Sequence, residues 1–242
     1  MNVPDIEKFI PSLDLVSHLG LYLLAYVALA VLLVSVLKAK FNIKTAYSRK
    51  IYHFLIFTAA AVLQVLYGLP AAVLMGVIVF LWVIFAVLKS KKSFFYQALA
   101  REKDEPYADR FIIIPLFATA IGGVLSNLFF PGFAFIGYLV GGWGDAIGEP
   151  VGSKLGKHPY QVPTLFGVKA TRTYEGSLAI FIISALICFL IYRFYGYQLH
   201  NALVYAIVCA FIATLVEAFS SHGLDNLTMQ FSAAAASYYL LT

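Results

Sequence analysis

Blocks of about twenty mostly apolar residues recur along the whole sequence, and they constrain the fold more than any other feature. A helix of about twenty residues crosses the ~30 Å hydrocarbon core of a bilayer. Only 12% of the 242 residues are charged, about half of the roughly 25% that soluble domains carry. No globular core of this size can absorb so many apolar side chains. The sequence therefore predicts an all-α, polytopic integral membrane protein.

Eight helices are expected from the apolar blocks and the turns between them. They lie near residues 19–38, 50–68, 70–88, 110–130, 132–150, 175–195, 199–219 and 224–241. The fifth is unusual, because its second half, from Gly141 to Pro150, is too polar and too rich in glycine to face lipid. Such a segment is stable at membrane depth only inside protein or beside a water-filled cavity. We therefore expect one transmembrane domain over residues 1–242, with about seven or eight spanning helices.

The distribution of basic residues predicts the orientation of these helices. Of the 17 Lys and Arg residues, all but Lys8 and Arg193 fall in the three stretches 38–50, 89–110 and 154–172. By the positive-inside rule, these stretches lie on the cytosolic side and the N-terminus lies outside. Acidic residues outnumber Lys8 ahead of the first apolar block, which does not favour a secretory signal peptide.

Two further features have mainly structural interpretations. Residues 91–99 combine lysines with aromatic side chains, which suits either a short helix in the headgroup region or a solvated connector. Cys188 and Cys209 both lie inside apolar blocks, so we expect them to pack in the core without forming a disulfide framework.

Five acidic residues lie within or at the ends of the predicted helices, where a charge needs a specific reason. A charged side chain at the bilayer centre costs ~2.5–3.5 kcal/mol on insertion scales. The five are Asp145, Glu149, Glu175, Glu217 and Asp225. All of them lie toward the predicted cytosolic ends. A transporter would be expected to place such groups near the midplane, so a transport function is disfavoured.

Asp145 and Glu149 are four residues apart, so a helix presents both carboxylates on one face within one turn. Their mutual repulsion is relieved by a divalent cation, and Mg²⁺ commonly binds one or two carboxylates together with phosphate oxygens. The pair therefore favours a metal-binding or catalytic role. Helix capping, or pairing with Lys154 or Lys157, is the structural alternative.

A segment rich in glycine and basic residues follows this pair. Its members are Gly152, Gly156, Lys157, Lys169 and Arg172. Glycines let backbone amides approach an anion, and Lys and Arg neutralise its charge. The spacing does not match the Walker A motif. Beside two carboxylates, however, the segment favours phosphoryl transfer, which depends mainly on positioning and charge neutralisation.

Two more polar clusters occur near the predicted cytosolic ends of helices. The first contains Glu217, Ser220, Ser221, His222, Asp225, Asn226 and Thr228. Its Asp-Asn pair is also suited to capping the last helix, and the two roles are compatible. The second contains Arg49, Lys50 and His53, at the start of the second helix. Topology anchors and a packed histidine are the alternatives there.

Four segments, taken in order, resemble the polyprenol kinase family, which contains dolichol kinases, phytol kinases and CTP-dependent diacylglycerol kinases. Residues 48–53 resemble its RK-x-x-H motif; residues 144–152 with Gly156-Lys157 resemble GDA…G…GK; residues 172–177 resemble K-[S/T]-x-E-G-S; and Glu217 with residues 225–228 resembles E…DNLT. The resemblance spans about 48–230. Arg172 stands where Lys is common and Gly148 replaces a usual Ala. The short region ahead of these motifs is more similar to the phytol kinase and bacterial branches than to the larger dolichol kinases.

The resemblance implies a lipid kinase with Mg²⁺ as cofactor and CTP as phosphoryl donor. The acceptor would be a long-chain isoprenoid alcohol of the phytol, polyprenol or dolichol type, or diacylglycerol, and no nucleic-acid partner is expected. The implied catalytic residues are Asp145, Arg172 and Glu175, and the implied metal ligands are Asp145, Glu149 and Asp225. The implied nucleotide-binding residues are Gly144, Gly152, Gly156, Lys157, Lys169, Ser177, Asn226 and Thr228. Arg49, Lys50, His53 and Glu217 would support the site.

Two other functions are compatible with parts of this pattern. A CTP-dependent cytidylyltransferase acting on a lipid phosphate needs the same membrane setting and a related set of acids and bases. An anion or lipid transporter would explain polar groups in helices, but not why they gather toward one face of the membrane. The product released from CTP separates the first two functions, because a kinase releases CDP and a cytidylyltransferase releases pyrophosphate.

Overall fold

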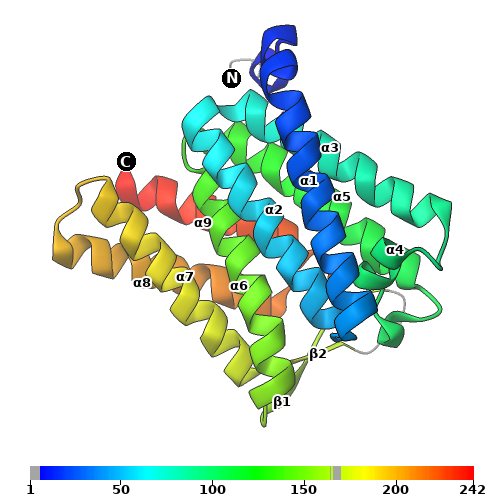
Figure 1. Cartoon of the computed structure of the whole chain (residues 1–242). Coiled ribbons are helices and arrows are strands. Elements are labelled where there is room, and N and C mark those ends of the chain that lie inside the picture. The colour runs from blue at the N-terminus through cyan, green and yellow to red at the C-terminus, as the bar shows by residue number, and fades with distance from the viewer. Residues whose placement is uncertain (1–5, 164, 166–169) are drawn as a thin grey trace. The chain divides into compact units, whose positions relative to one another are not determined.

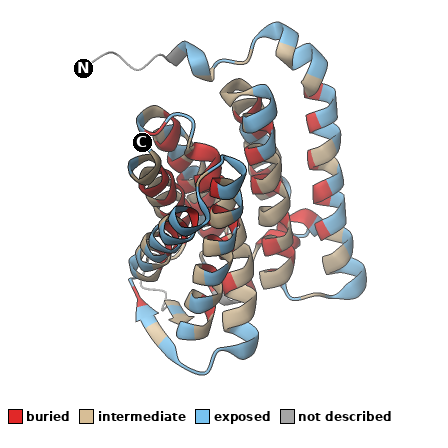
Figure 2. Ribbon diagram, turned by 90° about the vertical axis from the view of Figure 1, so that its left-hand side faces the viewer, coloured by how far each residue is buried: buried red, intermediate tan, exposed pale blue. Residues whose placement is uncertain are grey.

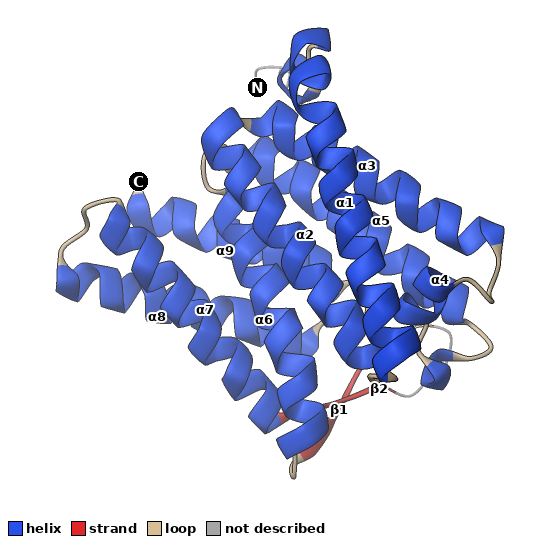
Figure 3. Ribbon diagram, viewed as in Figure 1, coloured by secondary structure: helices blue, strands red, loops and turns tan. Residues whose placement is uncertain are grey.

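The structure, a computed structural model, describes residues 6–163, 165 and 170–242 and is predominantly helical (Figures 1 and 3). The helices of this described part are α1 (Leu13–Phe41), α2 (Thr45–Tyr67), α3 (Leu69–Lys89), α4 (Phe94–Leu99), α5 (Ala108–Phe129), α6 (Ala134–Leu155), α7 (Tyr174–Phe194), α8 (Leu199–Phe219) and α9 (Asp225–Leu241). Short 3-10 turns, η1 and η2, occupy Ile6–Phe9 and Glu102–Asp104, and two strands, β1 (Pro159–Val162) and β2 (Ala170–Thr173), form a hairpin.

Within the described residues, six helices are long and apolar enough to cross a membrane, namely α1, α2, α3, α5, α7 and α8. Figure 2 shows exposed positions along the helices. Many exposed residues on the six apolar helices are large and apolar, such as Leu21 on α1, Leu81 on α3 and Phe211 on α8. Such faces suit contact with lipid rather than water. The chain is therefore a multi-pass membrane protein, as the apolar blocks predicted.

All eight predicted helices are present, with differences at their ends, but α6 and α9 are not among the six helices of the described residues that are long and apolar enough to span a membrane. α1 begins earlier than predicted because Ser12 caps it, with the Ser12 hydroxyl accepting a hydrogen bond from the Leu15 amide at 3.1 Å. α6 extends through Pro150 to Leu155, although a proline often marks a helix boundary. The hairpin was not predicted, because each of its strands is only four residues long and gives little alternating signal.

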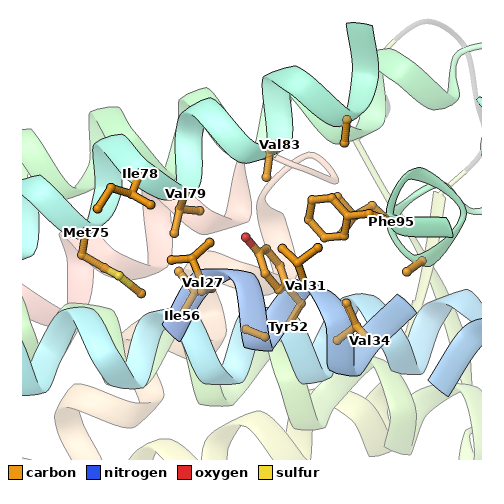
Figure 4. Close-up of a cluster of buried hydrophobic side chains, with 14 of the residues drawn as sticks. Val27, Val31, Val34, Tyr52, Ile56, Met75, Ile78, Val79, Val83 and Phe95 are labelled. Carbon is orange, nitrogen blue, oxygen red and sulfur yellow. The ribbon is translucent and has the colours of Figure 1, made fainter. Parts of the chain in front are cut away.

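The chain divides into two compact units, Met1–Leu116 and Phe117–Thr242. In the first, α1, α2 and α3 pack around a buried apolar cluster that includes Val27, Tyr52 and Met75 (Figure 4). The α4 side chain of Phe95 joins this cluster and meets the Tyr52 ring edge-on, with centroids 5.3 Å apart. The Ser48 hydroxyl also donates a hydrogen bond to the Ala98 carbonyl of α4 at 2.8 Å. The basic, aromatic segment therefore contains a short helix, and this helix packs inward.

In the second unit, α6 packs against α7 and α9 through a face of glycines. A Cβ atom on Gly137 would lie 2.3 Å from the backbone oxygen of Gln230 on α9, and one on Gly148 would lie 2.4 Å from Ile180 on α7. Small residues allow such close approach between membrane helices. In the polar, glycine-rich segment, Gly141, Gly142, Gly144 and Gly148 are buried in protein and the other residues are partly buried, which agrees with the prediction that it does not face lipid. Cys188 and Cys209 are buried free cysteines in the same unit, as expected from their apolar surroundings.

The predicted orientation has a direct test by cysteine labelling. Lys154 near the end of α6 and Gln198 ahead of α8 are both exposed, and the native cysteines are buried. We expect a membrane-impermeant maleimide to label Gln198→Cys in intact cells and to label Lys154→Cys only after permeabilisation, because the basic stretches are predicted to be cytosolic. The opposite labelling pattern would reverse the orientation.

The glycine face of α6 predicts a stability difference between two Gly→Ala variants. Gly137→Ala should lower the free energy of unfolding by ~1–3 kcal/mol, because the new methyl group meets backbone that cannot move aside cheaply. Gly76→Ala on α3 is the matched control, since nothing lies within 4 Å of its new Cβ. The control should be neutral or gain up to ~1 kcal/mol from helix propensity. SDS-induced unfolding in mixed micelles measures both, and equal stabilities would contradict the close approach.

Candidate active site

A buried arginine joins three elements of the second unit. Arg172 lies on β2, and its side chain is only 12% exposed. Its Nε pairs with Glu217 Oε1 near the end of α8 at 2.6 Å, and its Nη2 pairs with Asp225 Oδ2 at the start of α9 at 2.8 Å. Both carboxylates are 7% exposed. The guanidinium therefore compensates two acids that are largely removed from water.

The remaining guanidinium nitrogen of Arg172 binds the end of α8. Nη1 donates hydrogen bonds to the backbone carbonyls of Glu217 and Ser220, the latter at 2.9 Å. The last carbonyls of a helix lack intrahelical partners and carry partial negative charge. All three nitrogens of the guanidinium thus face protein oxygens. This arrangement leaves Arg172 little capacity to grip a triphosphate as well, although its predicted contact with nucleotide stays a prediction.

The electrostatics of Arg172 agree with this geometry. Burial lowers the pKa of the guanidinium, but the carboxylates of Glu217 and Asp225 outweigh burial, so that the pKa is raised above its ordinary value. Asp145 also contributes to the raised pKa, which places its carboxylate within electrostatic reach of the arginine. Arg172 therefore remains a cation throughout the physiological pH range.

Asp225 and its neighbours order the turn between α8 and α9. Oδ1 of Asp225 accepts hydrogen bonds from the amides of Gly223 and Asn226, at 3.2 and 3.0 Å. The Asn226 side-chain amide donates to the Thr119 hydroxyl on α5 at 2.9 Å. The hydroxyl oxygens of Ser220 and Thr228 lie 2.6 Å apart across the turn. Asp225 thus binds an amide in the first turn of α9, but the residue at the N-cap is Leu224, without a side-chain hydrogen bond, so the Asp-Asn pair does not cap the helix as the capping interpretation had it. Its role in ligand binding stays a prediction.

The three stretches that carry the predicted site meet in this unit. Asp145 on α6, Arg172 on β2 and Asp225 on α9 are far apart in the sequence, yet hydrogen bonds and charge link them. Asp145 and Glu149 occupy successive turns of α6, and both are partly buried. The structure therefore assembles a predominantly acidic cluster around a single arginine.

The predicted metal ligands fit a divalent cation only in part. Among the described residues, no three Asp, Glu, His or Cys side chains are arranged to hold a metal ion. Asp145, Glu149 and Asp225 thus do not form a three-ligand site, and Asp225 is already paired with Arg172. Asp145 and Glu149 are the two remaining predicted ligands. Two carboxylates are sufficient where phosphate oxygens complete the coordination shell of Mg²⁺.

The first turn of α7 is tied to β1 by two predicted site residues. Oε1 of Glu175 lies 2.7 Å from Nδ1 of His158, and Oε2 accepts a 3.4 Å hydrogen bond from the His158 amide. The Ser177 hydroxyl lies 2.7 Å from the Tyr160 hydroxyl. His158 and Tyr160 were not predicted as site residues, because only the register of the hairpin brings them to α7.

The predicted glycines and lysines have different surroundings. Gly144 packs against Met229 and Ile180, and a Cβ on Gly152 or Gly156 would lie 2.8 Å or less from an atom of Thr173. The structure thus gives these glycines a packing role, and their contact with nucleotide stays a prediction. Lys157 is exposed to solvent. Lys169 lies outside the described residues.

The residues predicted to support the site from α2 belong to the first unit. Lys50 is buried and Arg49 is partly buried. The His53 ring stacks on Phe57 with centroids 4.3 Å apart, which supports the packed interpretation of this histidine. A contribution of Arg49, Lys50 and His53 to the site stays a prediction.

Comparison with known proteins agrees with the pattern of motifs. The chain is 37% identical over 123 residues to a phytol kinase of Synechocystis sp., an alignment that covers 49% of this chain and 50% of the relative. The chain thus spans about half the length of the curated relative that it matches. No protein-family model and no solved structure matches the chain. The similarity confirms the resemblance to a polyprenol- or phytol-kinase-like family.

The buried arginine predicts a large loss of stability when it is removed. Arg172→Ala should lower the free energy of unfolding by ~3–5 kcal/mol, because two buried carboxylates lose their counter-charge. Lys91→Ala is the control, since its pair with Asp109 spans 3.6 Å and its side chain is 59% exposed. The control should lose only ~0–1 kcal/mol. Equal losses in the same micellar unfolding assay would contradict the assigned ion pairs.

Proposed function

We propose that this protein is a lipid-alcohol kinase that transfers a phosphoryl group from CTP to a long-chain isoprenoid alcohol. One observation carries the proposal: Asp145, Arg172 and Asp225, from three of the segments that resemble the polyprenol kinase family, lie in one charged cluster. The similarity to a phytol kinase provides independent support. Phosphoryl transfer depends mainly on positioning and charge stabilisation, and a cluster of this kind is suited to both.

We assign the two acids of α6, Asp145 and Glu149, to the part of the site where the phosphoryl group is transferred. Asp145 would accept the hydroxyl proton of the alcohol or share Mg²⁺ with Glu149, and Lys157 would approach the phosphates from the aqueous side. Bound Mg²⁺ would neutralise the triphosphate oxygens and the charge that develops during transfer. Arg172 would support Asp145 and Glu149 indirectly, because its nitrogens already bind Glu217 and Asp225.

The membrane setting accounts for the kind of acceptor. An isoprenoid alcohol keeps its chain in the hydrocarbon and its hydroxyl at the interface, whereas a nucleotide arrives from water. The charged cluster lies at the end of α8 and the start of α9, close to the start of α7 in the sequence, and there the two substrates would meet. The similarity to a phytol kinase favours an isoprenoid alcohol over diacylglycerol.

The proposal predicts a specific loss of activity in Asp145→Asn. Turnover of CTP with a lipid alcohol should fall about 100-fold or more, because the amide can neither take up a proton nor neutralise a metal. Purified wild-type and variant proteins are incubated with CTP, Mg²⁺ and phytol, polyprenol or diacylglycerol, and CDP, pyrophosphate and phosphorylated lipid are measured. Glu7→Gln, at an exposed acid of η1, is the matched control and should keep full activity.

Three outcomes would count against the proposal. Full activity in a folded Asp145→Asn protein would remove Asp145 from the reacting site. Release of pyrophosphate that depends on a phosphorylated lipid would identify a cytidylyltransferase instead. Absence of CTP turnover with all three alcohols would reject the kinase assignment.

A further inference from the structure

The hairpin places a tyrosine directly opposite the central arginine. In the register of β1 and β2, Tyr160 pairs with Arg172. Side chains at directly opposite positions of an antiparallel pair lie on the same face, with Cβ atoms ~4.5–5.5 Å apart. The Tyr160 side chain therefore stands next to the stem of Arg172. Neither the composition nor any sequence motif indicated Tyr160 as a candidate site residue.

Tyr160 also connects the hairpin to α7. Its hydroxyl lies 2.7 Å from the Ser177 hydroxyl, within hydrogen-bonding distance. Its ring meets the ring of Tyr174 with centroids 5.1 Å apart. Strand pairing, a hydrogen bond and a ring contact thus hold one partly buried side chain between β2 and the first turn of α7.

The Tyr160 hydroxyl acts as a neutral group within the charged cluster. Burial is the main cause of its raised pKa. The hydrogen bond between the Tyr160 and Ser177 hydroxyls and the positive charge of Arg172 partly offset burial, and Glu217 raises the pKa further. The phenol therefore stays protonated at physiological pH. A neutral phenol at this place adds no charge to the cluster.

We propose that Tyr160 is a positioning residue: the hydrogen bond between its hydroxyl and Ser177 anchors the side chain to α7, and the anchored side chain, opposite Arg172 in the hairpin, keeps Arg172 against Glu217 and Asp225. The catalytic part of this inference rests on the proposed kinase function. The position of Arg172 determines where the turn between α8 and α9 is held, since the same guanidinium binds both helices. Reacting groups must be placed accurately for phosphoryl transfer, so a small displacement of this turn slows the reaction.

The proposal gives Ser177 a role different from the predicted contact with nucleotide. If Ser177 acts through Tyr160, then Tyr160→Phe and Ser177→Ala remove the same hydrogen bond from its two ends. Their effects should be similar and should not multiply in the double variant, as expected for two residues that share one interaction. If Ser177 binds nucleotide directly, its effect should multiply with that of Tyr160→Phe and should appear in the KM for CTP.

The test compares wild type, both single variants, the double variant and Tyr174→Phe. We expect each single variant and the double variant to lower kcat about 3- to 10-fold, with KM for CTP unchanged, because one hydrogen bond is lost and no substrate contact changes. Tyr174→Phe keeps the ring that contacts Tyr160 and alters an exposed residue, so it should behave as wild type. Wild-type kcat in Tyr160→Phe, or multiplying effects, would overturn the inference.

A second readout does not require activity and separates this inference from the proposed function. Hydrogen exchange followed by mass spectrometry on the same detergent-solubilised proteins reports on the backbone of residues 217–226. Exchange there should increase in Tyr160→Phe and in Ser177→Ala, and stay unchanged in Tyr174→Phe. If the wild-type protein lacks kinase activity but shows this pattern, the positioning role stands and the reaction assignment fails. Unchanged exchange in Tyr160→Phe would overturn the positioning role.

Discussion

The ion pairs of Arg172 with Glu217 and Asp225 are the interaction on which the second unit depends. Two carboxylates lie almost out of water near helix ends, and a single planar cation compensates both. A guanidinium presents donors in several fixed directions, so one side chain can bind two acids and two carbonyls at once. A lysine ammonium group in place of the guanidinium would keep the positive charge but would not present hydrogen-bond donors in these fixed directions. Strand β2 of the hairpin places this side chain against the end of α8 and the start of α9.

The glycines of α6 complement this electrostatic contact with a steric one. Because Gly137 and Gly148 carry no side chains, α7 and α9 approach the α6 backbone closely. The depth and rotation of α6 are therefore set by backbone contact, and Asp145 and Glu149 take their places relative to Arg172 as a result. Close packing joins α6 to α7 and α9, and charge pairing joins β2 to α8 and α9, so that α9 takes part in both contacts.

The sequence predicted the helices and the meeting of distant polar stretches, because hydrophobic length and charge costs are local properties that one chain displays directly. It did not predict the packing contacts of Gly144 and Gly152, since a glycine that approaches a phosphate and a glycine that packs against a helix have the same sequence signal. The partners of Arg172 and the place of Tyr160 depend on the register of a short hairpin, which only tertiary contacts determine. Lys169 was predicted as a phosphate ligand and lies outside the described residues.

The polar second half of α6 has a consequence for how the protein is made. This segment carries Asp145 and Glu149, and its stabilising neighbours α7 and α9 are synthesised after it. Released alone into lipid, it would expose carboxylates and a glycine-rich backbone to hydrocarbon. The close contacts of α6 with these helices can therefore form only after α7 and α9 have been made. Folding of this unit thus depends on α9 to complete the environment that α6 requires.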